Sequence, residues 1–127
     1  MRIVLPWPDK GLSPNARLHR MAVVRLITAY RNDCGMACIA AGGRRMAPGA
    51  LHLTITFHPP DKRHRDLVNM LSSIKAGLDG IADVIGVDDS RWSLTIRRGG
   101  AVPGGLVEVV IMPEAGSAAV PVIGTIG

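Results

Sequence analysis

Acidic residues in two short segments have the chemistry of a divalent-cation site. Asp66 follows the basic run Lys-Arg-His-Arg, and Asp88 and Asp89 stand together in a turn further along the chain. Carboxylate oxygens are the ligands that Mg²⁺ prefers, and they must converge within roughly 2–2.6 Å of one ion. The structural alternatives are a helix N-cap for Asp66 and a solvated turn for the adjacent acids.

Val68 occupies the place where a second acid beside Asp66 would make chemical sense. Residues 66–85 carry apolar side chains in a four-three rhythm that predicts one helix. At ~100° per residue, the apolar stripe of this helix centres on Leu67, and Val68 lies on the opposite, polar flank with Lys75. An apolar residue on that flank indicates a site position that has lost its polar group.

The second carboxylate of a site at Asp66 must come from outside this helix. Asp79 and Asp83 share the polar flank, but thirteen residues of helix span ~20 Å, so they cannot join Asp66 on one ion. Asp88 and Asp89, in the turn that follows, are the remaining candidates. We therefore expect Asp66 and Asp89 to approach each other across the helix start and the turn.

Periods of two and of 3.6 residues in the apolar positions predict the elements that would position these groups. The expected strands are residues 3–5, 51–58, 92–97 and 106–112, and the expected helices are about residues 15–41 and 66–85. The core stripe of the first helix is expected at Val23, Ile27, Tyr30, Cys34, Ala37 and Ala41. A Gly- and Pro-rich segment, residues 99–105, is expected to form a hairpin loop between the last two strands.

This order, β-α-β-α-β-β, predicts an α+β fold in which two helices pack on one face of a four-stranded mixed sheet. One domain is expected over residues 1–112, followed by a flexible tail at 113–127, which has few charges and many small residues.

Composition favours a polyanionic partner. The chain has 15 Lys and Arg against 10 Asp and Glu, a net charge of +5, which points to nucleic acid before an anionic membrane. Cys34 and Cys38 are the only cysteines, and we expect two reduced thiols packed in the core. The opening residues lack the apolar core of a signal peptide, and no apolar run approaches ~20 residues. A cytoplasmic protein with no membrane partner is expected.

Three motifs, in this order, resemble the RusA-like Holliday junction resolvases. They are Leu-Pro-Trp-Pro at residues 5–8 followed by Asn15, Arg-Asp-Leu-Val-Asn at 65–69, and Val-Asp-Asp-Ser at 87–90. The resemblance covers roughly residues 3–112. It implies a small, homodimeric, magnesium-dependent endonuclease of bacteria and prophages that resolves four-way DNA junctions in recombination and repair, with Mn²⁺ as a substitute metal.

The resemblance also implies roles for individual residues. Asp66 and Asp89 match metal ligands of the family, with Asp88 beside them, while Val68 replaces a family acid. A family lysine is replaced by Ser72, and Lys75, one turn further along, takes the corresponding catalytic role beside Asp66 and Asp89. Candidate DNA contacts are Arg17, Arg20, Arg44, Arg45, Lys62, Arg63, Arg65 and Asn69.

Two other functions fit part of the sequence. A protein of the same fold that grips branched DNA without cutting it would explain Val68, and binding without nicking in Mg²⁺ or Mn²⁺ would identify it. A domain that binds duplex RNA by its shape would explain the basic charge but not the acids at positions 66 and 89. Competition between four-way DNA and duplex RNA separates these two functions.

Overall fold

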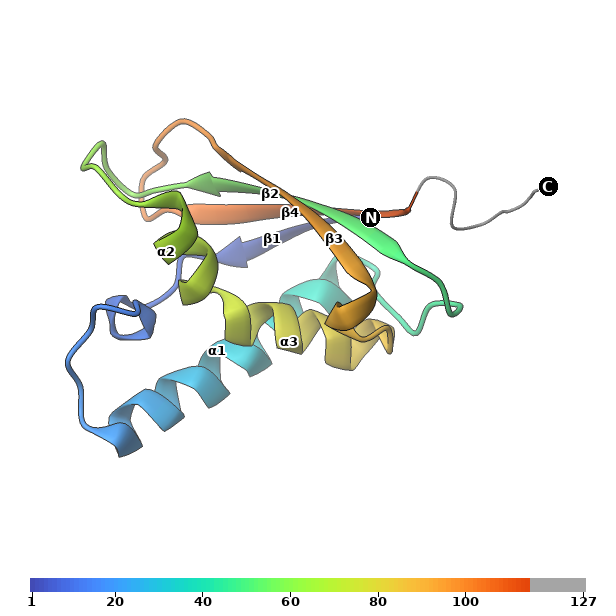
Figure 1. Ribbon diagram of the computed structural model, residues 1–127, viewed down its shortest axis with the longest axis horizontal. Helices are drawn as coiled ribbons and strands as arrows, with labels where there is room; N and C mark the ends of the chain where they lie inside the picture. Colours follow the sequence, from blue (N-terminus) through green and yellow to red (C-terminus); the bar gives the residue numbers. More distant parts are fainter. Residues whose placement is uncertain (115–127) are drawn as a thin grey trace.

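The computed structural model of the chain describes residues 1–114. The elements are β1 (Arg2–Pro6), η1 (Lys10–Leu12), α1 (Arg20–Ala40), β2 (Leu51–His58), α2 (Leu67–Ser73), α3 (Lys75–Ile85), η2 (Asp89–Arg91), β3 (Trp92–Arg98) and β4 (Leu106–Pro113). Figure 1 shows the helices gathered on one face of the four-stranded mixed sheet. The predicted α+β fold is confirmed. The predicted tail lies outside the described residues from position 115 on, and Pro113 belongs to β4.

The sheet has the strand order β1-β4-β2-β3. β4 is antiparallel to both of its neighbours, whereas β3 runs parallel to β2. A parallel pair needs a crossover connection, which α2 and α3 supply. The predicted hairpin between β3 and β4 is therefore wrong. After the crossover, β3 pairs with one edge of β2, so β4 pairs with the other edge. The loop of residues 99–105 therefore passes across the end of β2.

The core lies between the sheet and the helices. Along β2 the side chains of Leu51, Leu53, Ile55 and Phe57 are buried, while those between them are half-buried. This is the alternation that the sequence predicts for a strand with one covered face. The covered face continues through Ile3 of β1 and through the three buried residues of β4, Val107, Val109 and Ile111.

Helix α1 begins at Arg20, five residues later than predicted. The Ser13 hydroxyl accepts a hydrogen bond from the Asn15 amide, and the Ser13 carbonyl accepts one from Ala16, so this segment forms a turn instead of helix. Ile27, expected in the core stripe, is 42% exposed. In Figure 1 the amino-terminal half of α1 diverges from the sheet, and residues 20–29 of this half include no fully buried side chain.

The carboxyl-terminal half of α1 packs closely on α3 and β1. Gly80 of α3 lies against the backbone of α1, where an added Cβ would be 2.1 Å from the Arg31 carbonyl oxygen. The Tyr30 hydroxyl donates to the Pro6 carbonyl of β1 at 2.7 Å. Cys34 and Cys38 are buried free thiols, as expected, and burial raises the pKa of Cys34 to about 12.

The helix predicted over residues 66–85 is two helices that meet at Ile74. The Ser73 hydroxyl donates to the Asn69 carbonyl at 2.9 Å, and the Ile74 amide bonds to the Leu71 carbonyl three residues back. Regular α-helix is interrupted in two ways here. The serine hydroxyl bonds a carbonyl of the preceding turn, and the last turn is tightened to a bond across three residues. The four-three apolar rhythm continues across this break, so it gives no sign of the break.

Candidate metal and nucleic-acid site

Asp66 is the N-cap of α2. Its backbone is extended, and its Oδ1 accepts a hydrogen bond of 3.0 Å from the Asn69 amide. The side chain is exposed. Asp66 therefore has the capping role that the structural alternative predicted. Because a carboxylate has about four lone-pair positions, one capping bond leaves capacity for a ligand.

Val68 is on the polar flank, as the helical wheel predicts. It is the second residue of α2, and its side chain is 64% exposed. A buried side chain here would have made this position part of the core. Instead, an apolar side chain is exposed to solvent two positions after Asp66, where the resemblance to the RusA-like resolvases places a second acid.

Lys75, at the start of α3, joins two carboxylates. Its Nζ donates to Asp79 Oδ1 at 2.6 Å and to Asp89 Oδ2 at 2.7 Å. These hydrogen bonds, to Asp79 and then Asp89, raise the pKa of Lys75, and the bond from Lys75 lowers the pKa of Asp89. The two acids thus lie within two hydrogen-bond lengths of each other. Asp79 was placed on the polar flank from the sequence, but its bond to Lys75 was not predicted, although the i, i+4 spacing of the two residues was a signal for it.

Asp66 and Asp89 are placed by different elements and hold different partners. Within residues 1–114, no hydrogen bond or ion pair joins them, and no group of three or more His, Cys, Asp or Glu side chains could hold a metal ion. Asp88 is exposed and accepts a hydrogen bond from the Ser90 hydroxyl. The convergence of Asp66 and Asp89 stays a prediction.

The donor set nevertheless suits magnesium. The groups available at these positions are carboxylates, and Mg²⁺ is commonly bound by one or two protein carboxylates, several waters and substrate phosphate. The Lys75 ammonium group already neutralises the charge of Asp89. A metal ion at Asp89 must therefore either displace this ammonium group or bind beside it.

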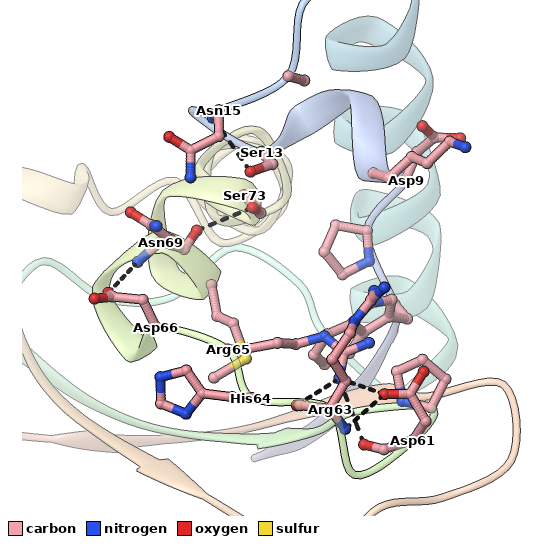
Figure 2. A pocket seen from close by; sticks show the side chains of 16 residues that line it. Asp9, Ser13, Asn15, Asp61, Arg63, His64, Arg65, Asp66, Asn69 and Ser73 are labelled. Carbon is pink, nitrogen blue, oxygen red and sulfur yellow. Dashed lines mark hydrogen bonds and ion pairs between the residues drawn. The ribbon is translucent and has the colours of Figure 1, made fainter.

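A cavity of about 590 Å³ opens beside Asp66. It is bounded by α2, η1 and the loop that precedes α2, and Figure 2 shows Arg65, Asn69 and Asn15 around it. Trp7 forms its aromatic wall. The Arg65 guanidinium lies 5.6 Å from the centroid of the Trp7 ring and bonds Asp61 Oδ1 at 2.8 Å. That bond lowers the pKa of Asp61.

A second cavity, of about 390 Å³, adjoins the first. Both are lined by Ser13, Ala16 and Ser73, and the second cavity reaches Lys75 and Asp79. The two cavities therefore lie on either side of shared wall residues, one beside Asp66 and the other beside the lysine that bonds Asp89.

The predicted DNA contacts fall into separate groups. Arg63, Arg65 and Asn69 line the cavity beside Asp66, and Lys62 lies in the adjoining loop. Arg17 and Arg20 are exposed at the start of α1. Arg44 and Arg45 follow the opposite end of α1, and Arg45 lies against Gly86, so these two arginines do not belong to the same end of the molecule.

Comparison with known proteins gives little functional information. No protein-family model matches the chain. An uncharacterized protein of Xylella fastidiosa (strain Temecula1) is 40% identical over 93 residues, which are 71% of this chain and 61% of that protein. The chain thus spans less than two thirds of that relative's length. In the described residues, no helix is both long enough and apolar enough to cross a membrane.

Proposed function

We propose that the protein is a magnesium-dependent endonuclease that cuts branched DNA, with the four-way junction as its substrate. The observation that supports this most is the pair of adjoining cavities, one lined by Asp66 and two arginines and the other by Lys75, which bonds Asp89. An enzyme that hydrolyses a phosphodiester in DNA needs carboxylates for a hard cation and positive charge for the phosphate, and these cavities offer both.

The chain's own residues have separate tasks in this proposal. Asp66 and Asp89 would hold Mg²⁺ or Mn²⁺, which when bound supplies an activated water and neutralises charge on the leaving oxygen. Lys75, at the start of α3, would donate to the scissile phosphate. Arg63 would contact a backbone phosphate, which fixes the position of the DNA without reading its sequence.

A homodimer is part of the proposal, because resolving a four-way junction needs two symmetric cuts. Two-fold symmetry would provide two equivalent sites, and a stable interface buries roughly 800 Å² on each partner. Exposed apolar side chains suit this role on α1, where Met21, Val24 and Met36 are 54%, 46% and 65% exposed, and on β4, where Met112 is 59% exposed.

A second candidate function is binding of branched DNA without cleavage. The exposed Val68 favours it, because the position two residues after Asp66 has no carboxylate and the site has lost a ligand. Both functions need the same basic surface, and they differ only in what happens to the DNA after binding.

A junction assay with matched variants separates the two functions. Labelled four-way junctions are incubated with protein in Mg²⁺ or Mn²⁺, and binding and nicking are measured together. Asp66→Asn and Asp89→Asn each remove one charge, and Asp33→Asn makes the same change on the exposed surface of α1. Paired nicks that only the first two variants lose support the endonuclease. Binding without nicks selects the second function, and equal affinity for junction and plain duplex contradicts both.

A further inference from the structure

In the cavity beside Asp66, the Arg65 guanidinium lies over the Trp7 ring, 5.6 Å from its centroid, and we call this pair the Trp7–Arg65 platform. The Trp7 ring meets Phe57 edge-on, with centroids 6.5 Å apart and an interplanar angle of 86°. A Cβ added to Gly105 would lie 2.9 Å from the Trp7 ring, so the chain also packs closely there. The Arg65 guanidinium over this ring is fixed by Asp61 and by the Arg63 carbonyl oxygen. Aromatic rings and guanidinium planes are the surfaces on which proteins stack unpaired bases.

Carboxamides line the side of the cavity opposite this platform. Asn69 is held by its backbone, whose amide bonds Asp66 and whose carbonyl bonds the Ser73 hydroxyl. The side chains of Asn69 and Asn15 line the cavity, and Figure 2 shows Arg65 across it. Each carboxamide offers both a donor and an acceptor, the combination that pairs with the polar edge of a base.

The size of the cavity agrees with a nucleotide, and two of its cations are free to meet a phosphate. Its volume of about 590 Å³ lies in the range of small-ligand sites, roughly 300–1,000 Å³. Each acid that lines it already accepts a hydrogen bond within the protein: Asp9 from Gly11, Asp61 from Arg63, and Asp66 from Asn69. Asp61 also forms an ion pair with Arg65, whereas Lys10 and Arg63 form no ion pair within the described residues, so these two cations of the lining are available to a phosphate group.

We propose that this cavity binds one unpaired nucleobase of branched DNA, stacked on the Trp7–Arg65 platform with its edge read by Asn15 and Asn69. A base inside a duplex must lose its pairing and stacking before it can enter, at a cost of roughly a few kcal/mol, and this cost is lowest for a base that is already unpaired at a branch point. The inference rests on the proposed function, because it assigns this cavity the task of distinguishing a branch from plain duplex.

The test compares junctions that carry one unpaired thymine at the branch with junctions that carry an abasic residue at the same place. Affinity is measured in Ca²⁺, alongside a short single strand of thymidines and the same strand with an abasic residue. Base stacking on an aromatic side chain predicts that loss of the base weakens binding roughly 5- to 150-fold in both pairs of substrates.

Variants connect that difference to the cavity. Trp7→Ala should reduce the ratio of base-containing to abasic affinity towards one, Trp7→Phe should keep most of it, and Asn69→Ala should lower it. The matched control Asn32→Ala, on the exposed surface of α1, should leave the ratio unchanged.

Equal affinity of the wild-type protein for base-containing and abasic substrates would overturn the inference. If the protein then still preferred junction to duplex, the proposed function would stand. If it bound no junction but distinguished the single strands, the nucleobase site would stand and the proposed substrate would be wrong.

Discussion

Replacing Val68 with Asp restores a carboxylate beside Asp66 and tests the site directly. Val68 is the second residue of α2 and 64% exposed, so the new charge stays in water and has no burial cost. A negative charge in the first turn of a helix stabilises it by ~0.3–1 kcal/mol. The variant should therefore fold and unfold at the same urea concentration as the wild type, or at a slightly higher one.

The effect on metal binding is larger than the effect on the fold. A tenfold gain in affinity for Mg²⁺ corresponds to ~1.4 kcal/mol. At saturating Mg²⁺ this gain appears in full as added stability, because the ion binds the folded state alone. Urea denaturation of wild type and Val68→Asp, with Mg²⁺ and with a chelator, measures it, and junction nicking should increase in parallel.

Ile39→Asp is the control for the added charge. Ile39 lies in the last turn of α1 and is 54% exposed, so this variant gains a carboxylate away from Asp66 and outside the proposed interface residues. If both variants respond equally to Mg²⁺, or if Val68→Asp unfolds, the assignment of position 68 to a metal site is wrong.

Three further outcomes are expected. Lys75 lowers the pKa of Asp89, so the stabilisation from this pair is complete above the ordinary aspartate pKa and is lost as the pH falls through the lowered value. Lys75→Met should raise the pKa of Asp89, which a carboxyl ¹³C NMR titration measures. An unchanged titration would refute the pair. Gly80→Ala should lower the free energy of unfolding by ~1–3 kcal/mol through overpacking against the Arg31 carbonyl, whereas Gly100→Ala, with nothing within 4 Å, should not; equal urea midpoints would contradict this. Light scattering at micromolar protein should give a dimer, and a monomer that remains monomeric on a junction would exclude paired cutting.

The parts of the fold that could be predicted from the sequence are those set by local periodicity. Leu51, Leu53, Ile55 and Phe57 alternate with polar residues and are all buried, since a half-covered strand has a period of two. The strand order could not be predicted, because a Gly- and Pro-rich loop reads as a hairpin whether or not its flanking strands pair. The break at Ile74 was hidden because the apolar rhythm passes through it without a change.

In the candidate site, too, the features set within one helix could be predicted from the sequence, and the contacts between elements could not. The cap at Asp66 and the exposure of Val68 follow from the position of each residue along one helix, so the sequence sufficed for both. Tertiary structure decides which groups meet across elements. The Lys75 bond to Asp89 depends on where η2 returns to α3, and the cavity depends on Trp7 meeting Arg65 from distant parts of the chain.

The central claim is that Asp66 and Asp89 share one metal ion, and a crystal structure of the protein grown with Mn²⁺ tests it most directly. The anomalous signal of manganese locates the ion without ambiguity. We predict one peak within roughly 2–2.6 Å of a carboxylate oxygen of each residue, with Lys75 released from Asp89. Carboxylates held more than ~10 Å apart, too far to share one ion, with Lys75 still bonded to Asp89 and no peak between them, would contradict the claim.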